Sequence, residues 1–283
     1  MKIWEIIQAA VFRLADAEDA RLAAEVLLAH VLKCTKEEIF KNEDLELMPA
    51  DEVLFSGFFD RFIAGEPIAY ITGKKEFYGL DFFVNKDVLI PRPETEHLID
   101  EVLAFASRNR FELNIIDVGT GSGCIAVTLA KRLLNAKITA VDISEIALEV
   151  ARKNASNHNV AGRIAFIHSD LFEKVVGSFD VVVANLPYIG REKFNSITRE
   201  VLEYEPHVAL FGGDDGLRLY EKLFQQMNAR KKLPLLFIGE FGFLQGDKIR
   251  QLLDQYFGTC SIAILKDYAS IERMFMVVSP AHV

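Results

Sequence analysis

The sequence predicts an α/β fold, and three observations carry that prediction. Through residues 1 to about 65, apolar side chains recur at helical spacing. From residue 112 onward, short apolar strands alternate with helical patterns, which is typical of a parallel sheet covered by helices on both faces. The last two predicted strands have no long helix between them, so they would form an antiparallel edge. These patterns together favour a Rossmann-like sheet preceded by a small helical bundle.

The composition indicates a globular protein with a sizeable core. The chain has 283 residues, of which 51% are hydrophobic, and it is long enough for about two domains. Its formal net charge of −9 disfavours nonspecific binding of nucleic acid, because such binding neutralises phosphates with Lys and Arg side chains.

Targeting segments and cysteine frameworks are not expected. No apolar run approaches the roughly 20 residues that span a membrane, and the first ten residues are interrupted by polar side chains, unlike a signal peptide. The three cysteines, Cys34, Cys124 and Cys260, form no C-x-x-C pair, which disfavours disulfides and a zinc site. We therefore expect a cytoplasmic protein without membrane association or a bound metal.

The first 70 residues are predicted to form an antiparallel helical bundle. Apolar side chains recur at helical spacing over residues 3–14 and 22–31, and a further helix starts near Asp51. Gly65 would end that helix, because glycine readily adopts the left-handed conformation at a helix C-terminus. No pattern in this range indicates catalysis, so the chemistry is expected in the rest of the chain.

Residues 71–93 are predicted to link the bundle to a sheet domain, which would occupy residues 94–283. The aromatic stretch 77–84 is interrupted by Gly79, a pattern typical of a short β-hairpin. Pro91 and Pro93 then precede the Glu-Thr-Glu sequence at 94–96. Because the residue before a proline is disfavoured in the helical region, they favour extended backbone before a new helix. This change of character places the domain boundary in the linker.

The strands and helices of the sheet domain alternate regularly. The predicted strands are residues 114–118, 137–142, 163–167, 179–184 and 235–238, with 261–265 and 274–278 as the final pair. Helical patterns cover residues 122–134, 145–158 and 216–230. In the usual doubly wound order the fourth strand lies beside the first, so the loops after these two strands would meet at one edge of the sheet.

A glycine-rich loop of the pattern D-x-G-x-G-x-G follows the first strand. Its residues are Asp117, Gly119, Thr120, Gly121, Ser122 and Gly123. Glycines permit a tight turn and let a ligand touch the backbone, and ligands of open parallel sheets bind beyond the carboxyl ends of the strands. Asp142 ends the second strand, 19 residues after Gly123, where an acid can accept hydrogen bonds from both hydroxyls of a ribose.

The charge of this loop favours one cofactor over another. A dinucleotide places its pyrophosphate on the helix N-terminus, where the carboxylate of Asp117 would repel it. S-adenosylmethionine instead carries an ammonium, a sulfonium and a ribose, which suit an acidic site. Asp170 follows the third strand and is expected to accept from the adenine amino group, with Leu171 and Phe172 packing on the ring. A helix cap and a core pair are the alternative interpretation of these residues.

The sequence Asn185-Leu186-Pro187-Tyr188 follows the fourth strand. The Asn185 side-chain oxygen and the Leu186 carbonyl would hold the two hydrogens of a planar NH2 group and direct its lone pair at a methyl about 3–3.5 Å away. Pro187 would stiffen the turn, and Tyr188 would stack on the flat acceptor group. These residues predict direct in-line methylation of an amino group without a general base; a turn with a packed tyrosine is the alternative.

These segments resemble the bacterial release factor glutamine methyltransferases, the PrmC/HemK family, over nearly the whole chain. The resemblance rests on the glycine loop, the Asn-Leu-Pro-Tyr turn and the stretches 66–73, 76–79, 89–96, 204–206, 209–213 and 266–268. It implies a class I methyltransferase fold, S-adenosylmethionine as cofactor and S-adenosylhomocysteine as product. It also implies that the N-terminal bundle docks a peptide chain release factor, whose Gly-Gly-Gln glutamine accepts the methyl group on its side-chain amide, which would tune translation termination.

The same resemblance assigns residues to the two ligands. Gly119 to Gly123, Asp142, Leu171 and Asn185 would line the cofactor, and Asn185 to Tyr188 would hold the substrate glutamine. Four further residues are candidates from their positions alone. Arg92, Glu94 and Thr95 would close over the cofactor from the linker side, and Glu205 would touch the substrate, with structural capping as the alternative for each.

Three other functions stay open at this point. The family usually has Pro where this chain has Leu186, and the same turn occurs in adenine methyltransferases that act on nucleic acid, either RNA or DNA. Residues 1–75 hold 9 Lys and Arg against 14 Asp and Glu, a net charge of 9 − 14 = −5, which argues against such a substrate. Methylation of a ribosomal protein glutamine and a noncatalytic cofactor-binding module are the other two alternatives. We expect a monomer with no direct nucleic-acid substrate.

Overall fold

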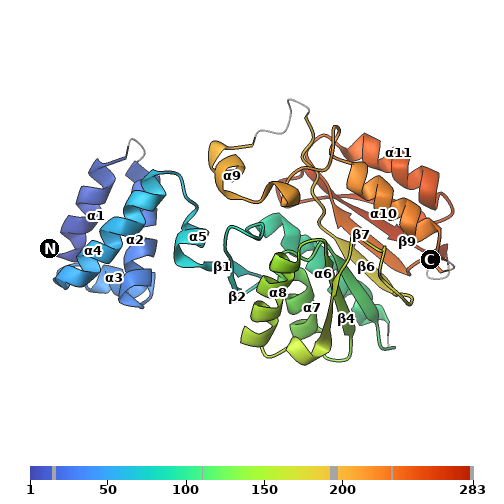
Figure 1. Ribbon diagram of the computed structural model, residues 1–283, viewed down its shortest axis with the longest axis horizontal. Helices are drawn as coiled ribbons and strands as arrows, with labels where there is room; N and C mark the ends of the chain where they lie inside the picture. The colour runs from blue at the N-terminus through green and yellow to red at the C-terminus, as the bar shows by residue number, and fades with distance from the viewer. Residues whose placement is uncertain (15–16, 110, 192–196, 231, 281–283) are drawn as a thin grey trace. The chain divides into compact units, whose positions relative to one another are not determined.

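The computed structural model describes residues 1–14, 17–109, 111–191, 197–230 and 232–280. Its contacts divide the chain into two compact units (Figure 1). The N-terminal unit comprises Met1–Lys74 and Arg199–Tyr204, and the sheet unit comprises Lys75–Thr198 and Glu205–Val283. The contacts thus place the division within the predicted linker 71–93, and the boundaries at residues 70 and 93 stay predictions.

The N-terminal unit is helical, as the sequence predicts. Its helices are α1 (Ile3–Phe12), α2 (Ala17–Leu32), α3 (Lys36–Lys41), α4 (Pro49–Ile63), α5 (Ile68–Thr72) and α9 (Arg199–Tyr204). Helix α1 buries an apolar stripe that runs from Ile3 to Ala10, and this stripe shares a core with Leu27 and Leu28 of α2. Helix α4 begins with Pro49, which suits the first turn because that position needs no hydrogen-bonded N–H.

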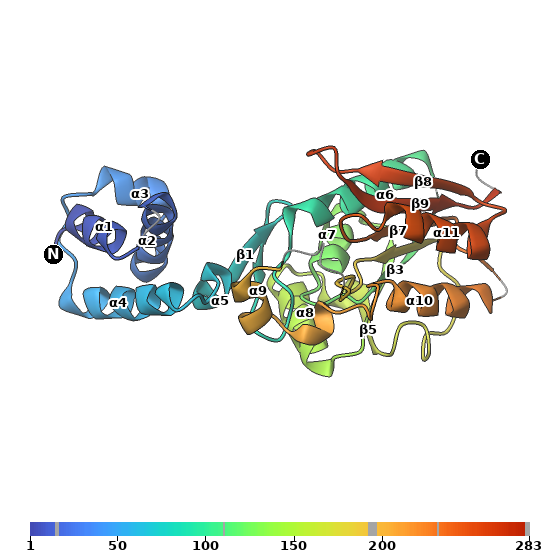
Figure 2. The same cartoon turned by 90° about the horizontal axis from the view of Figure 1, so that it is seen from above.

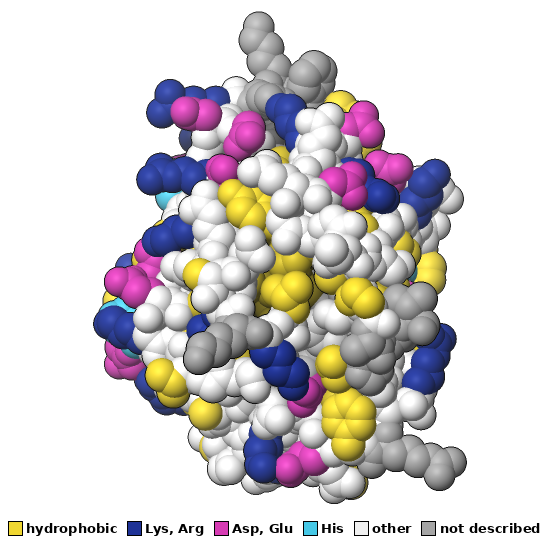
Figure 3. Space-filling view, turned by 90° about the vertical axis from the view of Figure 1, so that its right-hand side faces the viewer, with side chains coloured by type: hydrophobic (Ala, Val, Ile, Leu, Met, Phe, Trp, Pro, Cys, Tyr) yellow, Lys and Arg dark blue, Asp and Glu magenta, His cyan; other side chains and the backbone are white. Residues whose placement is uncertain are grey.

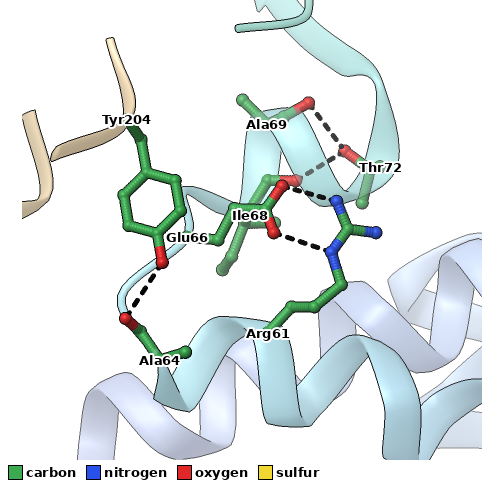
Figure 4. A network of polar contacts seen from close by, with 7 residues as sticks. All are labelled: Arg61, Ala64, Glu66, Ile68, Ala69, Thr72 and Tyr204. Carbon is green, nitrogen blue, oxygen red and sulfur yellow. Dashed lines mark hydrogen bonds and ion pairs between the residues drawn. The ribbon is translucent and has the colours of Figure 1, made fainter.

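Helix α9 belongs to the N-terminal unit although the sequence places it between two segments of the sheet unit. The Tyr204 hydroxyl donates a hydrogen bond of 3.1 Å to the carbonyl of Ala64, just after α4 (Figure 4). Nearby, the Arg61 guanidinium donates twice to the carboxylate of Glu66, which fixes the chain as it leaves α4. Nothing in the sequence pattern predicts this grouping.

A short hairpin opens the sheet unit. Strand β1 (Lys74–Phe77) pairs with β2 (Leu80–Phe83) in a two-stranded sheet, so the turn and second strand lie in the predicted stretch 77–84 and the first strand begins before it. The two residues of the turn, Tyr78 and Gly79, have φ of 54° and 73°. Positive φ at both central positions is the geometry that matches the twist of paired strands, and it explains the glycine at the second position.

A seven-stranded sheet forms the centre of the sheet unit, in the order β5-β4-β3-β6-β7-β9-β8 (Figure 1). The strands are β3 (Asn114–Val118), β4 (Lys137–Asp142), β5 (Ile164–His168), β6 (Val181–Ala184), β7 (Leu236–Glu240), β8 (Ser261–Lys266) and β9 (Glu272–Val278). The five strands β3 to β7 run parallel, and β9 is antiparallel to both of its neighbours. The predicted parallel sheet, its antiparallel edge and the pairing of the first and fourth strands are therefore confirmed.

Helices cover both faces of this sheet (Figure 2). The helical segments of the sheet unit are η1 (Pro93–Thr95), α6 (Glu96–Arg108), α7 (Cys124–Arg132), α8 (Glu145–Asn157), η2 (Ala161–Arg163), η3 (His207–Ala209), α10 (Arg218–Asn228) and α11 (Gly246–Phe257). Helices α6, α7 and α8 share a core with one face, and α10 and α11 with the other. Helix α11 is absent from the predicted elements, although Ile249, Leu253 and Phe257 are buried at helical spacing. Within the described ranges, no helix has both the length and the apolar character needed to cross a bilayer.

Candidate active site

A cavity of about 260 Å³ opens at the carboxyl ends of the parallel strands. It is lined by the linker, the glycine loop, the ends of β4, β5 and β6, and the segment around η3. A larger depression of about 780 Å³ lies at the opposite end of the sheet and includes Leu113, Lys137 and Arg163. Ligands of open α/β sheets bind beyond the carboxyl ends of the strands, so the first cavity is the candidate site.

The glycine loop joins β3 to α7 and forms one wall of the cavity. Gly119, Gly121 and Gly123 have φ of 76°, 53° and 81°, a backbone region in which only glycine is free of strain. A Cβ at Gly119 would also lie 3.0 Å from Cδ2 of Leu186, so the loop and the Asn-Leu-Pro-Tyr turn are in close contact. The positions from Gly119 to Ser122 line the cavity, whereas Gly123 packs against Ala151 of α8.

Asp117 lies beneath the glycine loop and does not line the cavity. Its Oδ2 accepts hydrogen bonds from the Thr120 hydroxyl at 2.6 Å and from the Ala126 N–H at 3.2 Å. Its Oδ1 is buried and has no hydrogen-bond partner among the described residues. Burial raises the pKa of this carboxyl to about 7. The side chain therefore ties the loop to α7, and its direct contact with a cofactor stays a prediction.

Asp142, at the end of β4, does line the cavity. Its Oδ2 accepts from the Gly121 N–H at 2.8 Å and its Oδ1 from the Ser144 N–H at 2.9 Å. Burial raises the pKa of this carboxyl, while the backbone donors act in the opposite direction. The two backbone donors hold the group in place, and since each carboxylate oxygen can accept more than one hydrogen bond, it still has capacity for the two hydroxyls of a ribose.

Asp170 and Leu171 form the wall of the cavity next to Asp142. Asp170 is ion-paired with the Lys222 ammonium of α10, a partner that the sequence analysis does not identify. Leu171 is buried and has φ of 53°, an uncommon backbone conformation for a leucine. The neighbouring Phe172 is buried in the core and lies outside the cavity, so only Leu171 is in position to pack on an adenine.

The turn after β6 contributes Asn185, Leu186 and Pro187 to the cavity. The Asn185 Nδ2 donates to Thr95 Oγ1 and to Glu240 Oε2, both at 3.0 Å. Since Nδ2 is engaged by two protein oxygens, Oδ1 is the polar atom of this side chain that remains for a ligand. The Leu186 side chain is almost fully buried against Gly119. The leucine that replaces the usual proline of the family at this position is accommodated there.

Tyr188 does not line the cavity. Its hydroxyl donates to Glu240 Oε1 at 3.0 Å, and its backbone carbonyl accepts from Gln245 Nε2 at 2.8 Å. Burial raises the pKa of the hydroxyl above its ordinary value, so the group is a donor at neutral pH. Tyr188 thus supports the turn from behind, and its stacking on a substrate stays a prediction.

Glu240 is the site residue that sequence reasoning misses. It ends β7, is 2% exposed, and its carboxylate accepts from Thr95, Asn185 and Tyr188. Burial raises its pKa, and the hydroxyl donors oppose that shift. Its signal in the sequence is an acid at the end of the apolar stretch 236–239, at the edge where sites of parallel sheets form.

The candidate residues of the linker have different places. Arg92 and Thr95 line the cavity, whereas Glu94 is exposed and lies outside it. The Arg92 guanidinium lies 2.5 Å from Glu205 Oε1, and the Ile90 N–H donates to Glu205 Oε2 at 3.2 Å. Glu205 is buried and holds the linker in place, which supports the capping interpretation over substrate contact.

The residues of the cavity fit S-adenosylmethionine. Asp142 can receive the ribose, Leu171 offers an apolar surface to the adenine, and Asp117 Oδ1, buried behind the loop, is an acceptor without a partner among the described residues. Among the residues that the structure describes, no group of three or more His, Cys, Asp or Glu side chains is placed to hold a metal ion.

Comparison with known proteins identifies both parts of the chain. Residues 98–214 match the family model described as "Methyltransferase small domain", and residues 5–73 match the "PrmC N-terminal domain". The fold resembles the N-terminal domain of human METTL16 in complex with SAH, with a TM-score of 0.52 and 17% identity over 71% of this chain and 76% of that one. The match supports the class I methyltransferase fold.

Curated relatives align with the chain over nearly its full length. The release factor glutamine methyltransferase of Koribacter versatilis is 39% identical over 269 residues, which cover 94% of each chain. That of Bacillus cereus is 36% identical over 279 residues, 97% of this chain and 98% of that protein. The predicted resemblance is confirmed. The chain belongs to the release factor glutamine methyltransferase family, and it is an enzyme that uses S-adenosylmethionine.

Proposed function

We propose that the chain transfers a methyl group to the side-chain amide nitrogen of the glutamine in the Gly-Gly-Gln sequence of a peptide chain release factor. One observation supports this most directly. The Asn185 amide lines the cavity with its nitrogen already bonded to protein oxygens, which leaves a carbonyl acceptor for an NH2 group. The names of the full-length relatives support the same substrate.

The turn residues orient the substrate amide. We assign the Asn185 Oδ1 and the Leu186 carbonyl to the two N–H groups of the glutamine, with Pro187 stiffening the turn between them. Holding both hydrogens in one plane presents the nitrogen lone pair perpendicular to that plane. A positioned nucleophile of this kind accounts for most of the rate in a reaction that needs no general base.

The acidic side of the cavity holds the cofactor. When bound, S-adenosylmethionine supplies an electrophilic methyl group on a sulfonium. We assign the ribose to Asp142, the adenine to Asp170 and Leu171, and the remainder to the loop of Gly119, Thr120, Gly121 and Ser122, while Arg92 and Thr95 cover the site from the linker. During transfer the new carbon–nitrogen bond forms as the carbon–sulfur bond breaks, and the nitrogen then loses one proton to solvent.

The charge of the protein favours a protein substrate over nucleic acid. The net charge is −9, and acidic and basic side chains are interspersed over the face shown in Figure 3, without a continuous basic stripe. Nucleic-acid enzymes need such a stripe to neutralise phosphates. We therefore expect a protein substrate and no direct contact with RNA or DNA. As separate parts of the proposal, we expect the enzyme to be monomeric and to act in the cytoplasm.

Incubation with labelled S-adenosylmethionine and a purified release factor tests this function. We expect one methyl group per release factor, located by mass mapping on the Gly-Gly-Gln glutamine. A release factor with Gln→Ala at that position is the matched control and should take up no label. Label on ribosomal RNA or on a ribosomal protein, with none on the release factor, would replace the proposed substrate.

We also assign release factor docking to the N-terminal unit. This unit exposes apolar side chains that its own core does not use, among them Phe12 at 93% and Val53 at 72% exposure. Replacing both by Ser should raise KM for a whole release factor about 3–10-fold and leave KM for a short Gly-Gly-Gln peptide unchanged. The matched control is Val176→Ser, since Val176 is 85% exposed on the sheet unit. Equal effects on both substrates would contradict this assignment.

A further inference from the structure

Three donors from two separate segments, the linker and the turn after β6, converge on the carboxylate of Glu240. The Thr95 hydroxyl donates to Oε2 at 2.7 Å, the Asn185 Nδ2 donates to the same oxygen at 3.0 Å, and the Tyr188 hydroxyl donates to Oε1 at 3.0 Å. Glu240 ends β7, which pairs with β6. Gly239 and Ala184 are paired across these strands, and Glu240 and Asn185 are the next residues along each chain segment. The acid is thus directly behind the proposed substrate-binding turn.

The chemistry of these partners fixes which way the Asn185 amide faces. A carboxylate only accepts hydrogen bonds, so the Asn185 atom next to Glu240 must be the nitrogen. The Thr95 hydroxyl has a single hydrogen and donates it to Glu240, so its oxygen must also accept from Asn185. A reversed amide would set Oδ1 against two acceptor oxygens deep in the protein, which is costly. Both neighbours therefore select the same orientation.

We infer that Glu240 is a positioning residue that makes the site select a side-chain amide and reject a carboxylate. By fixing the Asn185 amide, it presents a carbonyl acceptor to the cavity, and this acceptor pairs with the N–H of a glutamine but repels the oxygen of a glutamate. This inference rests on the proposed substrate, and it adds how the site distinguishes the amide of glutamine from the carboxylate of glutamate. It matters because a carboxylate is itself a methyl acceptor and would otherwise form a methyl ester.

The backbone around Glu240 is held by a different residue. The buried Tyr220 hydroxyl contacts the carbonyl of Ala184 at 3.1 Å and also the carbonyl of Glu240, and so links the ends of β6 and β7. Changing the side chain at 240 leaves these contacts in place. The effect of Glu240→Gln should accordingly fall on the orientation of Asn185 more than on the path of the chain.

The test compares two acceptors in wild type and in Glu240→Gln. The acceptors are a release factor with its natural glutamine and the same protein with glutamate at that position, and mass spectrometry distinguishes a stable methylamide from a base-labile methyl ester. Wild type should prefer glutamine by at least about 10³-fold in kcat/KM. In Glu240→Gln, the new amide can donate as well as accept, so Asn185 can reverse; we expect the preference to fall at least about tenfold, with an unchanged calorimetric Kd for S-adenosylmethionine.

Two further variants separate positioning from structure. Thr95→Ser keeps the hydroxyl and should retain the wild-type preference, whereas Thr95→Val removes it and should lower the preference. This pair decides the question even where Glu240→Gln does not fold. Glu205→Gln is the matched control, because Glu205 is also a buried carboxylate in the sheet unit but has no contact with the Asn185 amide; it should leave the ratio of the two substrates unchanged.

The outcomes distinguish the inference from the function on which it rests. An unchanged preference in both Glu240→Gln and Thr95→Val, or an equal loss on both acceptors, overturns the role of Glu240 while the methylation of glutamine by wild type stands. Failure of wild type to methylate the glutamine, with normal cofactor binding, overturns the proposed function instead.

Discussion

The two halves of the active site use buried carboxylates in different ways. On the cofactor side, Asp142 accepts from the Gly121 and Ser144 N–H groups, and Asp117 accepts from the Ala126 N–H and the Thr120 hydroxyl, all within 21 residues. On the substrate side, Glu240 accepts from side chains that are 52 to 145 residues away in the sequence. The three backbone donors on the cofactor side fix the shape of the glycine loop and its neighbours. The three side-chain donors at Glu240 are themselves fixed in orientation, which determines the atom that Asn185 presents to the cavity. The first half is therefore built for shape and the second for chemical identity.

Removing the acceptor on the substrate side should have the largest effect. Asn185→Ala deletes the oxygen that we assign to the substrate N–H, so kcat should fall at least about 10²-fold. Asp142, Asp170 and Leu171, which we assign to the ribose and the adenine, are unchanged, so the Kd for S-adenosylmethionine measured by calorimetry should stay within about threefold. Turnover at the wild-type rate would show that Asn185 does not orient the substrate.

The corresponding change on the cofactor side should act on affinity. Asp142→Ala removes the carboxylate that accepts from Gly121 and Ser144 and that we assign to the ribose. Loss of hydrogen bonds to a charged group should weaken the Kd for S-adenosylmethionine about 10–100-fold by calorimetry, and saturating cofactor should recover part of the rate. An unchanged Kd would refute the ribose assignment.

The linker lines the cavity beside both halves of the active site, and the ion pair between Arg92 and Glu205 helps to hold it in place. Arg92→Ala leaves the buried Glu205 carboxylate without its cation, and the free energy of unfolding in urea should fall by about 1–3 kcal/mol, less than for a fully buried pair because Arg92 is one-third exposed. The double variant Arg92→Ala, Glu205→Gln should recover part of this loss. Arg250→Ala, which breaks the exposed pair with Asp254, is the control and should cost under about 1 kcal/mol. Equal losses in the two arginine variants would contradict the prediction.

The smallest expected effect is on how the free energy of unfolding depends on pH, and it concerns Asp117 on the cofactor side. Burial raises the pKa of Asp117 to about 7, so between about pH 4 and 7 the folded protein binds a proton that the unfolded chain releases. This group thus makes stability fall as pH rises through that window. Asp117→Asn cannot titrate, so its free energy of unfolding relative to that of wild type should rise as pH rises through that window. Parallel curves in urea from pH 4.5 to 7.5 would place the carboxyl pKa near its ordinary value.

Local patterns predicted most of the fold and the cofactor side. The spacing of Asp117, the glycines and Asp142 is a property of one strand-loop-helix unit and the next strand, and the structure brings these residues together at one edge of the sheet. Glu240 could not be predicted in the same way, because its partners lie in two distant segments that meet β7 only in the folded protein. The inward orientation of Tyr188 has the same cause, since it depends on that buried acid.

The placement of helix α9 has a consequence for how this protein can be divided. The chain passes from one unit to the other after Lys74, again after Thr198 and once more after Tyr204, so neither unit is a continuous piece of sequence. A fragment ended at Lys74 would lack the tyrosine that donates to Ala64. The N-terminal unit is thus not a cassette that can be exchanged between relatives by a single crossover; residues 199–204 have to be exchanged with it.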